Sequence, residues 1–254
     1  MPDQRTSLWL PFGAHPDATV RLLCLPHAGA GASAFLSWGR GLPPEIGLCP
    51  VQPPGRDRRM SEEPFTCVQP LVRELAGEVV ARVASPYAIF GHSTGALAAF
   101  ELVREIRRLG APGPVHLFVA GRRAPQLPIR RSELGRLSLQ ELADLLRKLG
   151  GTPPDLLADR DMLAMMQPLL AADFDVNEDY QFVAQDPLDI PITAFAGTSD
   201  AGADVAMMTA WREQTTTEFA IHPLDGGHFA IFDHASTVHS AITTTLGQNA
   251  GQLR

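Results

Sequence analysis

The segment spanning residues 87–96 reads Tyr87-Ala88-Ile89-Phe90-Gly91-His92-Ser93-Thr94-Gly95-Ala96. Its first four residues are typical of a buried strand, and apolar residues at helical spacing follow Gly95. A strand, the pattern Gly-x-Ser-x-Gly and a helix, in this order, indicate a nucleophile elbow, a strained turn that exposes a serine hydroxyl. Gly91 and Gly95 leave room for the strand and the helix to pass closely. The sequence therefore predicts that Ser93 is a nucleophile, rather than a serine in a turn without chemistry.

Predicted strands and helices alternate along the rest of the chain. Six runs read as strands, at residues 21–25, 46–51, 87–90, 115–120, 192–196 and 219–222. Helical spacing of apolar residues follows or precedes them, at residues 71–83, 97–110, 205–211 and 236–246. This alternation predicts an α/β-hydrolase fold, with a mostly parallel central sheet and helices on both faces. With 254 residues, 45% of them apolar, the chain fits a single domain over residues 1–254.

The long interval between the fourth and fifth predicted strands breaks the alternation. A capping box at Ser138 begins a helix that Gly150 and Gly151 end. A second helix is expected over residues 161–172, and Pro168 should kink or divide it. We interpret residues 122–185 as a helical lid inserted into the domain. Its methionine and leucine side chains have two possible roles, namely core packing and contact with an apolar substrate.

Charge and cysteine content exclude several classes of protein. The formal net charge of −7 does not suggest a nucleic acid or an anionic membrane as a partner. A signal peptide consists of a basic segment followed by an apolar run, and the first residues of this sequence do not show that pattern. Residues 83–100 carry no Asp, Glu, Lys or Arg, but their proline and glycines favour a buried strand and helix over a membrane span. The three widely spaced cysteines indicate a reduced, cytoplasmic protein, which we expect to be a monomer.

A nucleophilic serine requires a base and a group that orients the base. His228 lies in a glycine-rich loop just after the last predicted strand, from which an imidazole could reach Ser93. Asp200 follows the fifth predicted strand and is the preferred acid, although Asp204 and Asp225 are close alternatives in sequence. We therefore predict a catalytic triad of Ser93, Asp200 and His228.

Two backbone N–H groups should stabilise the negative oxygen that forms when Ser93 attacks a carbonyl. The first is that of Thr94, which follows the nucleophile, and the second is that of Ala28, in the loop after the first strand. No clustered His, Cys or Asp spacing indicates a metal site, and no metal is expected.

Several motifs together resemble the stand-alone type II thioesterases of polyketide and nonribosomal peptide pathways. They extend over nearly the whole chain: Pro26-His27-Ala28-Gly29, Pro53-Pro54-Gly55-Arg56, Gly91-His92-Ser93-x-Gly95-Ala96, Gly121-Arg122-Arg123-Ala124-Pro125, Leu149-Gly150-Gly151-Thr152-Pro153 and Asp225-Gly226-Gly227-His228-Phe229. The resemblance implies an editing enzyme that hydrolyses acyl groups from the phosphopantetheine arm of acyl or peptidyl carrier proteins. It also supports the triad and a mobile lid, and it implies no cofactor, since the substrate carries the phosphopantetheine. Thr94 stands where the family usually has methionine, which affects the expected acyl preference.

Three other functions are compatible with parts of this pattern. A generic carboxylesterase or peptidase usually has an oxyanion loop of the His-Gly-Gly type, and this chain has Pro26-His27-Ala28-Gly29 instead. An acyltransferase or cyclase would differ only in replacing water with an amine or a hydroxyl. A binding protein without activity is disfavoured, because all three catalytic residue types are present.

Arginines are concentrated in two loops that follow predicted strands. Residues 121–136 contain Arg122, Arg123, Arg130, Arg131 and Arg136 against one acidic residue, and Arg56, Arg58 and Arg59 surround only Asp57. A local excess of arginine in an acidic chain would attract an acidic carrier protein, and the guanidinium group would also bind a phosphate. We predict carrier docking at Arg56, Arg122, Arg123, Arg130 and Arg131. The alternative is a solvated or internally paired surface.

Overall fold

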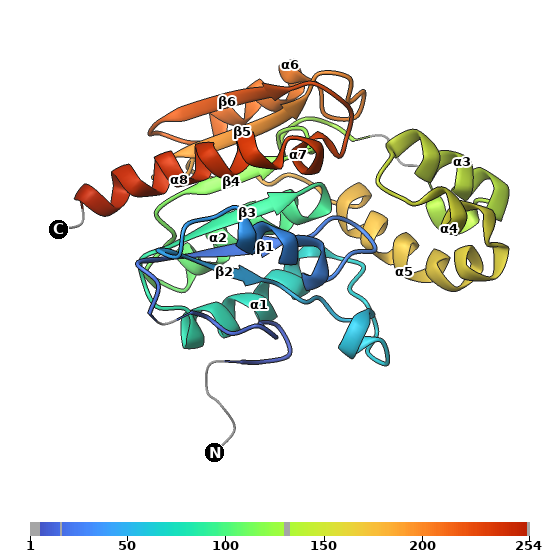
Figure 1. Ribbon diagram of the computed structural model, residues 1–254, viewed down its shortest axis with the longest axis horizontal. Coiled ribbons are helices and arrows are strands. Elements are labelled where there is room, and N and C mark those ends of the chain that lie inside the picture. The colour runs from blue at the N-terminus through green and yellow to red at the C-terminus, as the bar shows by residue number, and fades with distance from the viewer. Residues whose placement is uncertain (1–5, 16, 130–132, 253–254) are drawn as a thin grey trace.

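The computed structural model describes residues 6–15, 17–129 and 133–252 (Figure 1). Within these residues, six parallel strands form one sheet in the order β2-β1-β3-β4-β5-β6. The strands are β1 (Val20–Leu25), β2 (Ile46–Pro50), β3 (Tyr87–His92), β4 (Leu117–Ala120), β5 (Ile192–Gly197) and β6 (Phe219–Leu224). Every residue of β1 to β5 is buried, as expected for a sheet covered on both faces. The predicted α/β fold is confirmed.

The strand order changes direction between β1 and β3. The chain passes from β1 outward to β2, crosses back to β3 and then continues through β4, β5 and β6. Because Leu25 pairs with Gly91 and His92 with Ala120, the carboxyl ends of β1, β3 and β4 lie at the same edge. Loops diverge on either side of such a reversal, and ligand sites of open parallel sheets form there. The sheet therefore places the loops after β1 and β3 around one site.

Two groups of helices cover the two faces of the sheet. One apolar core includes side chains of α1 (Val68–Arg82), α2 (Thr94–Arg108), α6 (Val205–Thr209) and η4 (Ala210–Gln214). The other core includes side chains of η1 (Ala32–Arg40), α7 (Ala230–Asp233) and α8 (Ala235–Gln252). A short turn of helix, η2 (Asp57–Arg59), follows β2.

The interval between β4 and β5 is helical, and we call residues 121–191 the β4–β5 insertion. It contains η3 (Leu134–Arg136), α3 (Leu139–Leu149), α4 (Pro154–Ala158) and α5 (Arg160–Glu178). Figure 1 shows α3, α4 and α5 gathered at one end of the sheet. They share a separate cluster of buried leucines, which includes Leu142, Leu146 and Leu170. The predicted capping box at Ser138 is present.

Some predicted boundaries differ from the structure. The fourth strand begins at Leu117, two residues later than expected. The second helix of the insertion does not end at Ala172, and α5 continues through Pro168 to Glu178 as one helix. Division at Pro168 is therefore wrong. A proline removes one backbone hydrogen bond, and the buried side chains of Leu163, Leu170 and Val176 pack on both sides of it.

Candidate active site

Ser93 lies at the sharp turn between β3 and α2. Its backbone has φ 56° and ψ −122°, a strained conformation for a residue with a side chain. A Cβ atom on Gly95 would lie 2.2 Å from the carbonyl oxygen of Leu25, and one on Gly91 would lie 2.3 Å from that of Gly95. Only glycine permits these approaches, so the predicted nucleophile elbow is present in the structure.

Ser93, His228 and Asp200 form a chain of hydrogen bonds. His228 Nε2 lies 3.0 Å from Ser93 Oγ, and His228 Nδ1 lies 2.8 Å from Asp200 Oδ2. A carboxylate accepts, so the proton is on Nδ1 and Nε2 is left as an acceptor for the serine hydroxyl. This tautomer is the one required of a general base that removes the proton of Ser93.

Asp200 is held as a carboxylate by surrounding donors. Its Oδ1 accepts hydrogen bonds from the N–H groups of Gly202, at 2.9 Å, and Ala203, at 3.2 Å. Burial alone would raise the pKa of this carboxyl, but the hydrogen bond and charge of His228, together with the two N–H groups, lower the pKa below its ordinary value. Asp200 is therefore ionised at neutral pH.

The two alternative acids have other roles. The Asp204 side chain accepts from the N–H of Met207 at 2.8 Å and caps the start of α6. Asp225 is exposed, and its carbonyl oxygen accepts a hydrogen bond from His234. Of the three candidate aspartates, Asp200 is the one whose carboxylate is hydrogen-bonded to His228.

Thr94 and Ala28, whose N–H groups are predicted to stabilise an oxyanion, line the same cavity as Ser93. Thr94 is the first residue of α2, and Ala28 lies in the loop after β1. Both residues line the cavity, and neither N–H donates to an acceptor within the described part of the chain. They are thus available to an oxygen of a bound substrate.

A cavity of about 400 Å³ opens above the three hydrogen-bonded side chains. Ser93, Asp200 and His228 form part of its wall on the sheet side. The β4–β5 insertion supplies apolar lining through Leu145, Leu146, Leu149, Leu156, Met166, Leu170 and Phe174, and polar lining through Arg122, Arg123, Asn177 and Glu178. Of the methionines in α5, Met166 lines the cavity, whereas Met165 is 62% exposed. The cavity suits an apolar group next to a polar reaction centre.

Two further histidines, which the sequence did not indicate as part of the site, lie beside it. His92 Nε2 donates to the carbonyl oxygen of His228 at 2.9 Å, so His92 Nδ1 must accept from His27 Nδ1 at 3.3 Å. Burial, with the nearby His228 and His27, lowers the pKa of His92 well below its usual range. Burial and His228 also lower the pKa of His27 to about 4. Both rings are therefore neutral at pH 7.

Two of the arginines predicted to dock a carrier protein are buried. Arg56, which is 6% exposed, points both terminal nitrogens at the carboxylate of Asp173 in α5, at 2.8 Å each. Arg122, which is 3% exposed, donates to Asn177 Oδ1 at 2.7 Å and lies over the ring of Tyr180. Direct docking by Arg56 and Arg122 is therefore a wrong prediction, because both groups are used inside the protein.

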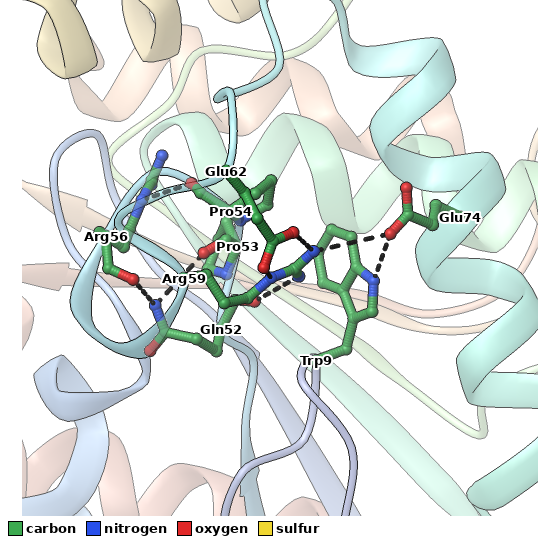
Figure 2. Close-up of polar contacts among 8 residues, drawn as sticks. All are labelled: Trp9, Gln52, Pro53, Pro54, Arg56, Arg59, Glu62 and Glu74. Carbon is green, nitrogen blue, oxygen red and sulfur yellow. Dashed lines mark hydrogen bonds and ion pairs between the residues drawn. The ribbon is translucent and has the colours of Figure 1, made fainter.

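A third arginine, Arg59 in the loop after β2, is also paired with groups of the protein itself. Figure 2 shows Arg59 bonded to the carbonyl oxygen of Gln52 and to Glu62, with Trp9 and Glu74 beside it. In the second arginine loop, the side chain of Arg123 donates to two backbone carbonyl groups and lines the cavity. Arg130 and Arg131 lie outside the described residues.

Neither a metal site nor a membrane-spanning helix is found in the described part of the chain. No group of three or more His, Cys, Asp or Glu side chains is arranged to hold a metal ion in residues 6–15, 17–129 and 133–252. No helix in these ranges has the length and apolar character needed to cross a bilayer.

The parallel sheet and the elbow at its edge are those of the α/β-hydrolase class. Within that class, a family model described as "Thioesterase domain" matches residues 20–246, and the chain belongs to this family.

Individual relatives indicate which kind of thioesterase this chain resembles. The gramicidin S biosynthesis protein GrsT of Aneurinibacillus migulanus is 43% identical over 216 residues, which are 85% of this chain and 84% of GrsT. The solved structure of the thioesterase RedJ, from the prodiginine biosynthetic pathway of Streptomyces coelicolor, matches with a TM-score of 0.84 and 37% identity over 91% of this chain and 87% of RedJ. The type II thioesterase BorB from the borrelidin biosynthetic cluster matches with a TM-score of 0.85 and 33% identity, covering 94% of this chain and 98% of BorB. The resemblance to type II thioesterases is confirmed.

Proposed function

We propose that this thioesterase hydrolyses acyl groups from the phosphopantetheine arm of acyl or peptidyl carrier proteins, and that it thereby edits an assembly line for polyketides or nonribosomal peptides. The main support is the hydrogen-bonded chain of Ser93, His228 and Asp200 beneath an apolar cavity. The choice of substrate is supported by BorB, a type II thioesterase of the borrelidin biosynthetic cluster, and by ClbQ, a structural relative from the colibactin NRPS/PKS pathway.

In the first half of the proposed reaction, Ser93 becomes acylated. His228 Nε2 takes the proton of Ser93 as its Oγ attacks the thioester carbonyl carbon. The carbonyl oxygen becomes an oxyanion, which the N–H groups of Thr94 and Ala28 stabilise. The intermediate collapses, the bond from carbon to sulfur breaks, and the departing pantetheine sulfur receives the proton from His228.

In the second half, water releases the acyl group. His228 takes a proton from a water molecule, whose oxygen attacks the acyl carbon of the ester on Ser93. A second oxyanion forms and accepts hydrogen bonds from the same two N–H groups. When it collapses, His228 returns the proton to Ser93 Oγ and a carboxylic acid is released. Asp200 keeps the imidazole in the required tautomer and stabilises its positive charge in both halves.

No cofactor or metal takes part in the proposed reaction, because the triad and two N–H groups supply every step. Cys24, Cys49 and Cys67 are free thiols, which supports the part of the proposal that places the protein in a reducing cytoplasm. The proposal also includes a monomeric state and carrier proteins as partners.

The test is to incubate a carrier-linked acyl thioester with the protein and to measure the free acid. Wild-type protein should release the acid, and mass spectrometry should find a transient acyl group on Ser93 and on no other residue. The Ser93→Ala variant should fold normally and lose at least about 10³-fold in kcat. Release of an amide or ester when an amine or alcohol is added, without free acid, would instead indicate an acyltransferase. Near-normal hydrolysis by Ser93→Ala would refute the mechanism.

A further inference from the structure

The oxyanion loop, which we define as residues 27–30, is bonded to two charged side chains from distant parts of the chain. The N–H of Gly29 donates to Asp173 Oδ2 at 2.7 Å. Arg56 Nη1 donates to the carbonyl oxygen of Ala30 at 3.2 Å and also to Asp173 Oδ2. Asp173 belongs to α5 of the β4–β5 insertion, and Arg56 belongs to the loop after β2. Three segments therefore meet at one ion pair.

The Arg56–Asp173 pair is unusually well enclosed for two charged groups. The side chains are 7% and 9% exposed, and both carboxylate oxygens face the guanidinium fork. The Nε of Arg56 is bonded to the carbonyl oxygen of Pro54 at 3.1 Å, which fixes the direction of the fork (Figure 2). Burial raises the pKa of Asp173 above its ordinary value, and Arg56 and the N–H of Gly29 oppose this increase, so the charge of Asp173 depends on these partners.

The hydrogen bond from Gly29 to Asp173 lies one residue after Ala28, the proposed oxyanion donor. Gly29 has φ +76°, and α5 approaches it so closely that a Cβ atom there would lie 2.7 Å from Leu170 Cδ2. The Gly29 N–H belongs to the peptide group that follows Ala28, so its bond to Asp173 restricts the rotation of Ala28. A donor contributes fully to catalysis only when its direction is fixed before the reaction.

We propose that Asp173 and Arg56 are positioning residues, which fix the N–H of Ala28 in the oxyanion site and thereby make catalysis depend on the placement of α5. This inference rests on the proposed thioester hydrolysis. The competing explanation is that the ion pair only stabilises the fold. Loss of stability in a single variant does not distinguish the two, because an unpaired buried charge destabilises a protein wherever it lies.

Three variants separate positioning from stability. Asp173→Leu removes both the charge and the oxygen that accepts from the Gly29 N–H. The double variant Arg56→Met with Asp173→Leu removes both charges, so it should regain stability relative to the single variant without restoring the bond to Gly29. Glu101→Gln is the control, since the Glu101 side chain, which is 12% exposed, pairs with Arg104 at 2.7 Å on α2, outside the residues that line the cavity.

Each variant is assayed with a short acyl-pantetheine thioester and with a trifluoromethyl ketone analogue of the acyl group. The ketone forms an oxyanion on Ser93 and reports on the oxyanion site directly. For Asp173→Leu and the double variant we expect kcat to fall about 10- to 100-fold with KM within about twofold, below the full loss of one donor of about 10²–10³. The inhibition constant of the ketone should weaken by the same factor as kcat/KM, and the affinity for the free acid product should stay within about twofold. Glu101→Gln should retain kcat.

The outcomes distinguish this inference from the proposed function. Wild-type protein without hydrolysis or acylation of Ser93 would refute the proposed function and this inference with it. Active wild-type protein together with variants that keep kcat and bind the ketone normally would refute only the positioning role. The positioning role would also be refuted if the double variant regained stability and kcat together, or if Glu101→Gln lost as much kcat as Asp173→Leu.

Discussion

Replacing Asp200 with asparagine should leave the fold intact and reverse the tautomer of His228. Asp200 Oδ1 accepts hydrogen bonds from the N–H groups of Gly202 and Ala203. In an asparagine side chain, only the amide oxygen could accept these two hydrogen bonds. In Asp200→Asn the amide oxygen should therefore occupy this place, and the amide NH₂ should face His228 Nδ1 at the 2.8 Å contact. Nδ1 then becomes the acceptor and the proton moves to Nε2, where it blocks removal of the Ser93 proton.

The expected loss follows from this reversal. The base is lost, and so is the charge that stabilises its protonated form, while volume and both N–H contacts are retained. Such a change costs about 10⁴-fold in kcat, equivalent to about 5.5 kcal/mol of barrier. The assay is release of free thiol from a short acyl-pantetheine, with thermal unfolding measured in parallel to confirm that the midpoint is preserved.

Asp204→Asn and Asp225→Asn serve as matched controls. Asparagine caps a helix about as well as aspartate, so Asp204→Asn should keep both stability and turnover. Exposed Asp225 should tolerate the change as well. The reasoning would be refuted if Asp200→Asn kept more than about a tenth of wild-type kcat, which is far above the loss expected for a blocked base, or if either control lost as much.

Three further predictions concern motion, docking and pH. If the β4–β5 insertion is a lid, its amide hydrogens should exchange faster than those of the strands and slow when an acyl analogue binds; uniform protection would contradict gating. If Arg130 and Arg131 dock the carrier, changing both to glutamate should reduce the turnover of acyl-carrier protein but have little effect on the turnover of acyl-pantetheine. Rising salt should reduce the wild-type turnover of acyl-carrier protein in the same way. Equal losses on both substrates would indicate a structural role. Burial lowers the pKa of His116 to about 4, so the unfolded chain binds a proton that the folded protein does not. Stability should therefore fall as pH decreases from about 6.5 to 4, by up to about 3 kcal/mol for this group, and the decrease should be smaller in His116→Gln; an unchanged slope would show that other groups dominate.

The elbow and the triad residues could be predicted because their signals are local. Glycines on both sides of Ser93, and an aspartate and a histidine just after strands, are visible in short segments, and a parallel sheet brings strand ends to one edge. The identity of the acid was open among three aspartates until the contact between Asp200 and His228 was known.

The role of Arg56 could not be predicted from its own segment. A cluster of arginines in a loop is typical of a solvated surface, and the burial of Arg56 depends on Asp173, which lies 117 residues away. The neutral pair of His27 and His92 depends in the same way on a contact between the loop after β1 and the end of β3. The full length of α5 was missed because proline is a strong local signal, and here packing on both sides of Pro168 prevails.

The two walls of the cavity differ in how freely they could change during evolution. The wall on the sheet side is fixed by backbone atoms in contact, such as Gly95 against Leu25, where an added methyl group has no space. The wall from the insertion includes leucine, methionine and phenylalanine side chains of α3, α4 and α5, which can be exchanged for others of similar volume. A family built in this way can keep one reaction and acquire new acyl substrates by altering the insertion alone. For protein engineering, the helices of the insertion are therefore the portion to exchange between relatives, with Asp173 retained in α5 so that its contact with Arg56 is kept.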